Sequence, residues 1–242
     1  MIPEYKFYVG FKDVNEKLFL KNSSMLTFME NIAGIHSAMA GDGLKATLSS
    51  HTAWLLLSWK VKVLKRPEHG DSVILRTWVT SVRRVYSNRE FEVVSSSGEV
   101  LAVAATKWVH INTEKGMPAK CSNELVESYT LEEKTNFENG VEVIILQPEE
   151  YKWEYTHRVE FDWIDMNYHM NNTRYLTLAE MAFAENGLKY PEANRFEIAY
   201  KKEVKRGETL KCFISETPDS YILAVKSADD NILHTLIKLY KD

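Results

Sequence analysis

The chain has 242 residues, of which 45% are hydrophobic and 26% are charged, a composition that excludes disorder throughout. The formal net charge of -4 argues against a general nucleic-acid binder, because such proteins carry a basic surface. The two cysteines are too few for a disulfide scaffold, and no stretch has the apolar length of a signal peptide or a membrane span. The sequence therefore predicts a cytoplasmic protein without membrane insertion.

The first part of the chain predicts a short extended segment, then one long helix, then a run of strands. A polar turn with Asn22 and Ser23 precedes apolar residues at the three- and four-residue spacing of a helix with one apolar face. These apolar residues are Met25, Leu26, Met29, Ile32, Ala33 and Met39. Strands are expected next at 53–64, 71–81, 87–95 and 99–111.

The same order of elements returns in the last third of the chain. A segment rich in charged residues over 112–155 comes first, and it predicts a linker with some local structure near 125–133. A helix follows with apolar residues Tyr175, Leu176, Ala179, Ala182 and Phe183. Strands are expected at 195–205, 209–216, 221–227 and 232–241. A long helix followed by antiparallel strands is an α+β unit, and the chain contains this pattern twice.

Direct alignment supports an internal duplication. An offset of 159 − 9 = 150 places Val9 on Val159 without a gap, and the matched pairs continue through Phe11, Asn22, Leu26 and Glu30. A second match joins Val63 to Gly70 with Val204 to Gly207, and it requires a short insertion, Pro67-Glu68-His69, in the first copy. We therefore predict an N-terminal domain over 1–125, a linker over 126–150 and a C-terminal domain over 151–242.

The two copies differ in polar residues at one place. The second copy has Asp165, Asn167, His169 and Asn171 where the first copy has Asn15, Lys17, Phe19 and Lys21. If the stretch is extended, residues two apart point to one side, next to the free N–H groups of a helix start. A carboxylate, a carboxamide and an imidazole in that place predict a hydrolytic site, although a hydrogen-bonded turn that caps a helix is the simpler interpretation of such a stretch.

The segment Asp165-Met-Asn-Tyr-His-Met-Asn-Asn-Thr-Arg-Tyr175 resembles the signature of acyl-acyl-carrier-protein (acyl-ACP) thioesterases, known from plant plastids and from bacteria. The resemblance extends over nearly the whole chain, including Lys65-Arg66-Pro67 and Trp108-Val109. The family's Tyr-Arg-Arg-Glu-Cys stretch reads Tyr200-Lys201-Lys202-Glu203-Val204 here, so Glu203 is kept and the Cys is not. Val204 excludes that Cys as a nucleophile, and we interpret Cys212 as an ordinary buried residue.

The resemblance implies a tandem hotdog fold in which each copy has a long helix wrapped by a curved antiparallel sheet. It implies hydrolysis of fatty acyl-ACP to free fatty acid and holo-ACP, which terminates fatty acid synthesis. Glu203 and His169 are then expected to hold and activate water, with Glu203 as the general base. Asn167 is expected to orient the substrate or the water, or to donate to the thioester oxygen, and Asp165 to fix the geometry of Asn167 and His169. Asn171 and Asn172 are expected to shape the turn and cap the helix.

The acyl chain is expected to lie in the N-terminal domain, against Met25, Met29, Ile32 and Trp54, which are also candidates for plain core packing. The expected partner is an acidic acyl carrier protein bearing a phosphopantetheine-linked acyl chain, and no nucleic acid. It would dock on Arg83, Arg84 and Arg89 or on Lys201, Lys202, Lys205 and Arg206. We expect no metal and no cofactor, because the histidines lack metal-ligand spacing and no phosphate-binding loop occurs. A homodimer is left open.

Three alternatives remain at this point: an acyl-CoA thioesterase, a hotdog dehydratase, and a non-catalytic acyl-binding protein. Comparing kcat/KM on acyl-ACP and acyl-CoA with the same acyl chain distinguishes an acyl-CoA thioesterase. Release of free thiol distinguishes hydrolysis from the hydration or dehydration of a dehydratase. Turnover in any such assay excludes a non-catalytic acyl-binding protein.

Overall fold

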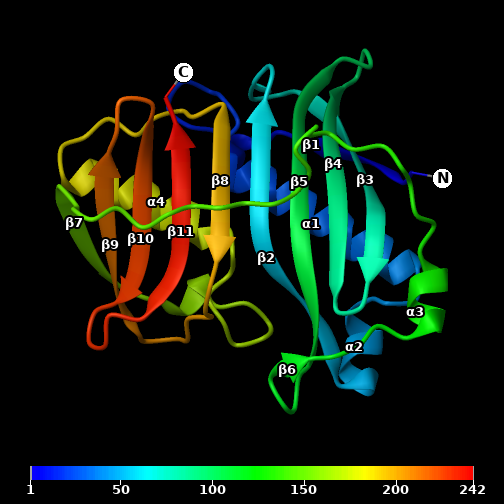
Figure 1. Cartoon of the computed structure of the whole chain (residues 1–242). Helices are drawn as coiled ribbons and strands as arrows, with labels where there is room; N and C mark the ends of the chain where they lie inside the picture. Colours follow the sequence, from blue (N-terminus) through cyan, green and yellow to red (C-terminus); the bar gives the residue numbers. More distant parts are fainter. Residues whose placement is uncertain (1, 242) are drawn as a thin grey trace. The chain divides into compact units, whose positions relative to one another are not determined.

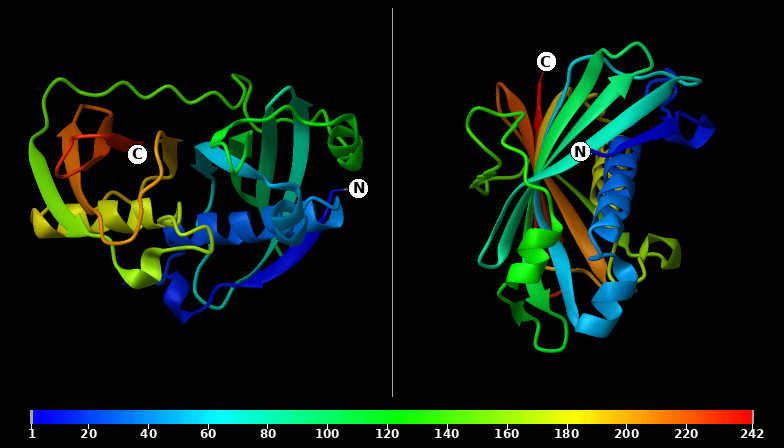
Figure 2. Two further views of the ribbon diagram at one scale, coloured as in Figure 1. Left: turned by 90° about the horizontal axis from the view of Figure 1, so that it is seen from below. Right: turned by 90° about the vertical axis from the view of Figure 1, so that its right-hand side faces the viewer.

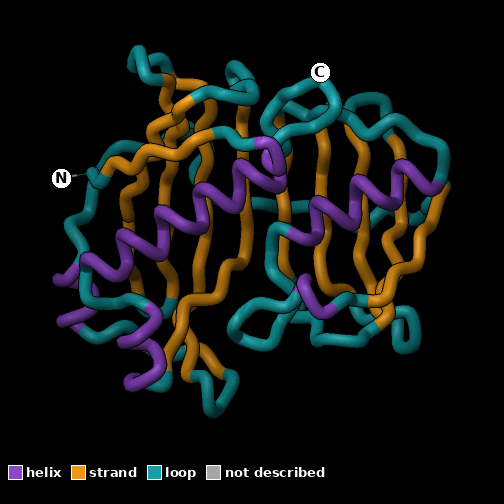
Figure 3. The backbone as a smooth tube through the Cα atoms, turned by 180° about the vertical axis from the view of Figure 1, so that it is seen from behind, coloured by secondary structure: helices purple, strands orange, loops and turns teal. Residues whose placement is uncertain are grey.

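The computed structural model describes residues 2–241 and divides the chain into two compact units, residues 1–142 and residues 143–242. None of the helices in the described residues is long and apolar enough to cross a membrane. Each unit combines one long helix with one antiparallel sheet, and the helix crosses the strands on a single face of that sheet (Figures 1 and 3).

The first unit has five long strands in the order β1-β3-β4-β5-β2, and the short β6 pairs with β5. Its strands are β1 (Glu4–Tyr8), β2 (Thr52–Val63), β3 (Ser72–Arg83), β4 (Tyr86–Ser95), β5 (Val100–Asn112) and β6 (Met117–Pro118). Its helices are η1 (Phe11–Asp13), α1 (Asn22–Met39), α2 (Leu44–Ser50) and α3 (Asn123–Ser128).

The second unit repeats this topology, with strand order β8-β11-β10-β9-β7. Its strands are β7 (Trp153–Arg158), β8 (Arg195–Tyr200), β9 (Thr209–Glu216), β10 (Ser220–Ser227) and β11 (Leu233–Tyr240), and its helices are η2 (Phe161–Trp163) and α4 (Arg174–Glu185). Element for element, β7 corresponds to β1, α4 to α1, and β8 through β11 to β2 through β5. The predicted duplication is therefore present in the connectivity of the fold, and each unit is a hotdog.

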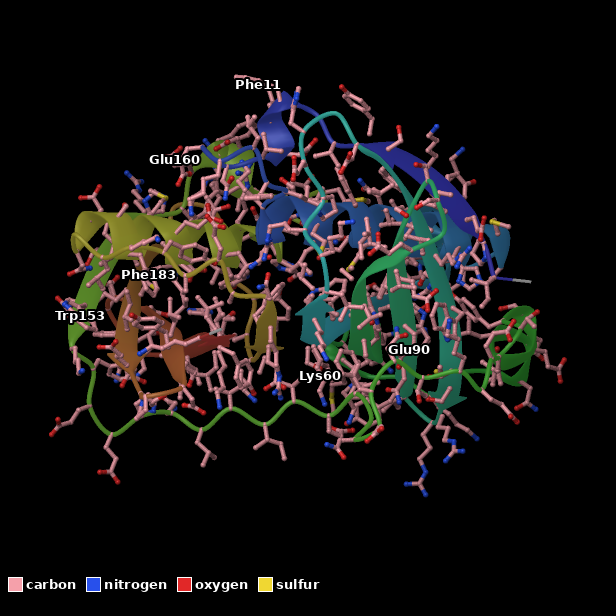
Figure 4. All side chains as sticks on the ribbon, turned by 90° about the horizontal axis from the view of Figure 1, so that it is seen from above. Phe11, Lys60, Glu90, Trp153, Glu160 and Phe183 are labelled. Atoms are coloured by element: carbon pink, nitrogen blue, oxygen red, sulfur yellow. The ribbon has the colours of Figure 1, made fainter. Side chains whose placement is uncertain are left out.

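The apolar face of each helix forms the core of its unit, as the helical spacing predicts. In α1 the buried residues include Met25, Leu26, Met29, Ile32 and Ala33, whereas Met39 is 67% exposed and does not belong to the core. In α4 the buried residues are Tyr175, Leu176, Leu178, Ala179, Ala182 and Phe183. Phe183 lies between α4 and the strands of the second unit (Figure 4). Burying a side chain of this size stabilises a fold by about 1.5–3 kcal/mol.

The segment after α3 covers the opposite face of each sheet, so the helices and this segment lie on opposite sides of the strands (Figure 2). In the first unit Asn136 donates its side-chain N–H groups to Phe91 O and Ala104 O, and Trp78 Nε1 donates to Lys134 O. In the second unit Ile145 packs on Ala199, Ala224 and Leu236. The linker segment is thus part of the fold in both units.

Seven of the eight expected strands lie within two residues of their predicted bounds. The exception is 195–205, because β8 ends at Tyr200. The backbone N–H groups of Lys201 and Lys202 both donate to His234 O, and His234 Nδ1 lies 3.1 Å from Lys202 O. These bonds end the strand and begin the loop that carries Glu203.

Candidate active site

The segment from Asp165 to Met170 is a tight turn and not the extended stretch that the sequence suggested. Asp165 N donates to His169 O at 2.8 Å, and Tyr168 N donates to Asp165 O at 3.1 Å. Tyr168 adopts a left-handed conformation with φ of 63°. The condition for the polar side chains to point to one side, an extended stretch, is therefore not met, and the alternative interpretation of a hydrogen-bonded turn before a helix is confirmed.

The carboxylate of Asp165 is the physical reason for the turn. Its Oδ1 accepts the backbone N–H of Asn167 at 2.8 Å and that of His169 at 3.3 Å. Asp and Asn side chains commonly close turns in this way, by bonding to the backbone two residues further on. Asp165 therefore positions Asn167 and His169 through their own main chain.

The first unit contains the same turn with other side chains. Asn15 Oδ1 accepts the N–H groups of Lys17 and Phe19, each at 3.0 Å, and Leu18 has φ of 66°. Asn15 N donates to Phe19 O at 2.9 Å, as Asp165 N does to His169 O. The fold thus needs an oxygen acceptor at this position, but it does not need the imidazole or the second carboxamide.

The loop that carries Glu203 pairs with this turn. Met170 N donates to Val204 O at 2.8 Å, and His169 and Lys205 form an antiparallel bridge. Further along, Lys205 N donates to Glu208 Oε1, and Gly207 turns the chain with φ of 83°, a conformation that favours glycine. Glu203 therefore lies on a loop docked against His169, and not on a strand as expected.

This pairing places the loop of Glu203 beside the turn that carries Asp165, Asn167 and His169, within one unit. In an antiparallel pair, residues diagonal to each other by two positions lie roughly 7–8 Å apart, the relation that His169 has to Glu203. Asp165 and His169 are half-buried, whereas Asn167 and Glu203 are exposed.

The start of α4 lies under this site. Asn171 Oδ1 accepts both the backbone N–H and the hydroxyl of Thr173, at 2.9 and 2.7 Å, so Asn171 shapes the turn before α4, as expected, whereas the N-cap residue of the helix is Thr173, which makes no side-chain capping bond. Tyr200 donates its hydroxyl to Asn172 O. Tyr175 in the first helical turn is buried, and burial raises the pKa of its hydroxyl, with a further rise from the nearby charges of Glu208 and Glu203.

The hydrogen bonds also correct the alignment of the two copies after the helix. Leu20 N donates to Pro67 O as Met170 N does to Val204 O, and Phe19 bridges to Glu68 as His169 does to Lys205. The structural pairs are thus Pro67 with Val204 and Gly70 with Gly207, so the predicted insertion Pro67-Glu68-His69 does not exist.

This register identifies Arg66 as the counterpart of Glu203, a relation that the sequence comparison missed. Arg66 donates to Leu20 O at 2.9 Å and to Asn22 Oδ1 at 2.8 Å. Asn22 Oδ1 is therefore an acceptor for the guanidinium of Arg66. A gapless alignment of 66–70 with 203–207 would have shown the pair, but the similarity of Val63-Leu-Lys-Arg66 to Val204-Lys-Arg206 led to an alignment in another register.

The residues predicted to contact the acyl chain lie in the first unit. Met25, Met29 and Ile32 are fully buried on α1. Trp54 is half-buried and donates its indole N–H to Asp42 Oδ2 at 2.7 Å. Burial is common to core and to pocket residues, so a contact with the acyl chain stays a prediction.

Arg89 does not belong to an exposed basic patch, contrary to one of the two expected docking surfaces. It is 5% exposed, and it donates to His36 Nδ1 at 2.8 Å and to Thr77 Oγ1 at 3.3 Å. Burial, followed by the charge of Arg89, lowers the pKa of His36 to about 4, so this imidazole is a neutral acceptor.

Cys212 is fully buried, as interpreted from the sequence, and burial raises the pKa of its thiol to about 12. A thiol in this state is not a nucleophile. Within residues 2–241, no group of three or more His, Cys, Asp or Glu side chains is arranged to hold a metal ion.

Comparison with known proteins defines the class of protein to which this fold and site belong. Sequence models of the acyl-ACP thioesterase N-terminal domain and C-terminal domain match residues 3–129 and 147–238. The chain therefore belongs to the acyl-ACP thioesterase family, which confirms the resemblance seen in the sequence.

Particular relatives come from plants and bacteria. Oleoyl-acyl carrier protein thioesterase 1 of Arabidopsis thaliana is 22% identical over 88% of this chain and 64% of its own length, so the chain spans somewhat less than two thirds of that relative. An acyl-ACP thioesterase from Bacteroides thetaiotaomicron superimposes with a TM-score of 0.86 at 23% identity, covering 99% of this chain and 97% of that one. The 12:0-ACP thioesterase from Umbellularia californica gives 0.85 at 15% identity, covering 99% and 96%. These likenesses confirm the predicted tandem hotdog fold.

Proposed function

We propose that this chain hydrolyses fatty acyl-ACP thioesters to free fatty acid and holo-ACP and thereby ends fatty acid synthesis. The observation that carries the proposal is the docking of the Glu203 loop on the turn of Asn167 and His169, in a chain of the acyl-ACP thioesterase family. The C-terminal domain supplies the chemistry, and the N-terminal domain holds the acyl chain against Met25, Met29, Ile32 and Trp54.

In the proposed reaction, a water molecule held between Glu203 and His169 attacks the thioester carbon. Glu203 takes a proton from this water, the new C–O bond forms, and the C–S bond breaks. The thiolate leaves on the phosphopantetheine arm and receives the proton that Glu203 took from the water, which gives holo-ACP and restores the carboxylate. General base catalysis of this kind typically contributes about 10²–10⁴ in rate.

Negative charge develops on the carbonyl oxygen as the water attacks. Asn167 is exposed at the tip of the turn, and its carboxamide N–H donates to this oxygen. Loss of one such donor typically costs roughly 10²–10³ in kcat. Asp165 acts through its backbone hydrogen bonds as a positioning residue. All four residues belong to one unit, so the mechanism needs no second copy of the chain.

The experiment is a thiol-release assay on acyl-ACP with the wild-type protein, Glu203→Gln, His169→Ala and Asn167→Ala. Each variant is expected to lower kcat at least a hundredfold while its circular dichroism and Tm stay close to wild type. Lys17→Ala is the matched control, because Lys17 holds the position of Asn167 in the first unit and is exposed. Near-normal turnover by Glu203→Gln or His169→Ala would remove that residue from the mechanism. Faster hydrolysis of acyl-CoA than of acyl-ACP with the same acyl chain would show that the protein is an acyl-CoA thioesterase.

We also propose a cytoplasmic location. Cys121 and Cys212 are both free and buried, which suits a reducing compartment.

A further inference from the structure

Four cations surround the proposed general base on its own loop. Lys201, Lys202, Lys205 and Arg206 are all exposed, and they flank Glu203 on both sides. None of the four forms an ion pair with another of the residues that the structure describes. We call residues 201–206 the basic loop.

The fold itself does not require these charges. In the register set by the hydrogen bonds, the corresponding residues of the first unit are Leu64, Lys65, Glu68 and His69. Lys65 there pairs with Glu99 at 3.1 Å, and Glu68 offsets its charge. Residues 64–69 thus carry the cations Lys65 and Arg66 and the anion Glu68, a net charge of +1, whereas residues 201–206 carry four cations and Glu203, a net charge of +3.

Exposed apolar side chains adjoin the basic loop. Phe161 is 72% exposed, Met166 is 55% exposed and Tyr168 is 82% exposed. Arg206 stacks over the Phe161 ring, 4.8 Å from its centroid, and the bridge between His169 and Lys205 joins the loop to the turn of Met166 and Tyr168. Aromatic and arginine side chains together are typical of the energetically dominant part of protein interfaces.

We propose that the basic loop, with Phe161, Met166 and Tyr168, is the surface on which the acyl carrier protein docks. This inference rests on the proposed function and selects one of the two surfaces expected from the sequence. An acidic carrier matches the uncompensated positive charge, and the exposed rings provide apolar contact. The phosphopantetheine arm of a carrier seated here enters beside Glu203 and His169, with its phosphate close to the cations.

The other docking surface expected from the sequence, formed by Arg83, Arg84 and Arg89, has fewer exposed cations than expected. Arg89 is buried, and only Arg83 and Arg84 of that group are exposed, at the β3–β4 turn of the first unit. Arg83 is therefore a suitable control for charge, and Phe11 is a suitable control for Phe161. Phe11 holds the equivalent place in η1 and is 85% exposed.

The test compares two substrates with the same acyl chain, acyl-ACP and acyl-pantetheine, which has neither carrier nor phosphate. The double variant Lys202→Glu/Arg206→Glu is expected to raise KM for acyl-ACP roughly tenfold or more, because two cations that face the acidic carrier become anions. Hydrolysis of acyl-pantetheine stays within about twofold of wild type, since neither side chain belongs to the catalytic set. Phe161→Ala raises KM for acyl-ACP in the same selective way, and Arg206→Lys keeps part of the wild-type value.

Arg83→Glu and Phe11→Ala are expected to leave both substrates unchanged. An unchanged KM for acyl-ACP in the double variant, or equal losses on both substrates, overturns the docking proposal. So does a larger effect of Arg83→Glu than of the double variant.

Calorimetric titration with a stable acyl-ACP analogue, in which an amide replaces the thioester, separates this inference from the proposed function. If the wild-type protein binds the analogue but releases no thiol from acyl-ACP, and the double variant binds the analogue tenfold more weakly, the result supports docking and refutes hydrolysis. Hydrolysis of acyl-ACP with equal binding by both proteins supports the function and refutes this surface. A wild-type protein that neither binds nor hydrolyses acyl-ACP refutes both.

Discussion

The carboxylate of Asp165 could act through its oxygen, which accepts hydrogen bonds in the turn, or through its negative charge. Substitution by Asn or by Ala distinguishes these two roles. Asp165 Oδ1 accepts two backbone N–H bonds, from Asn167 and from His169. Ala removes both acceptor contacts, and Asn keeps an oxygen in the same place. Asn15 already holds the equivalent turn of the first unit with two bonds of 3.0 Å.

The magnitude follows from those two bonds. A net contribution of about 0.5–1.5 kcal/mol for each gives a loss of about 1–3 kcal/mol for Asp165→Ala. Asp165→Asn is expected to stay within about 0.5 kcal/mol of wild type, because only the charge of the acceptor changes. The positioning role further predicts that Asp165→Asn keeps more kcat than Asp165→Ala.

Urea unfolding followed by tryptophan fluorescence gives the stability, and thiol release from acyl-ACP gives kcat. Asn15→Ala is the matched control: it is expected to cost a similar free energy in the first unit and to leave the catalytic residues in place. If Asp165→Asn destabilises the protein as much as Asp165→Ala, the acceptor argument is refuted. If Asp165→Asn is stable but has less activity than Asp165→Ala, the carboxylate does more than position the turn.

Three further predictions concern buried groups. Burial raises the pKa of Glu90 to about 7, although the backbone N–H of Asn136 and the charge of Lys60 act to lower it. Glu90 and Lys60 are labelled in Figure 4. The carboxyl therefore lowers the free energy of unfolding progressively as the pH rises from its unfolded pKa near 4.5 to about 7. Glu90→Gln should therefore be about as stable as wild type at pH 4 and more stable by an order of 3 kcal/mol at pH 8, and equal urea midpoints at pH 8 would contradict this. Arg89→Met leaves His36 and Thr77 without their donor in a buried site, and thermal unfolding should show a loss of about 2–4 kcal/mol, whereas an unchanged Tm would show that the network contributes little. Cys212→Ala should keep kcat within about threefold, since the buried thiol takes no part in the chemistry, and loss of turnover in a folded variant would reopen a thiol mechanism.

The fold was predictable because its signals are local and repeated. The spacing of apolar residues in α1 and α4 reports the buried face of each helix, and the offset of 150 reports the duplication. The conformation of 165–170 was not predictable in the same way. Alternating polar residues are compatible with a strand, and only the bonds of the Asp165 carboxylate and the left-handed Tyr168 close the segment into a turn.

The end of β8 and the partner of Glu203 depend on contacts distant in sequence. His234 on β11 takes the N–H groups of Lys201 and Lys202, and no pattern within 195–205 reports that contact. The burial of Arg89 is of the same kind, because its partner His36 lies on α1. The sequence thus identifies the four catalytic candidates by type, but tertiary hydrogen bonds decide which loop brings Glu203 to His169.

The exchange of Glu203 for Arg66 explains why only one copy can carry the proposed reaction. An arginine near a helix N-terminus is electrostatically unfavourable, and Arg66 is retained there by its bonds to Leu20 O and Asn22 Oδ1. Its guanidinium therefore joins the loop of Arg66 to the start of α1, and it has no basic atom that could accept a proton from water. At the equivalent place Glu203 is exposed, and its carboxylate has the oxygen atoms that a general base requires. Because both copies keep the same turn with different side chains, the fold of the first unit does not depend on the catalytic candidates.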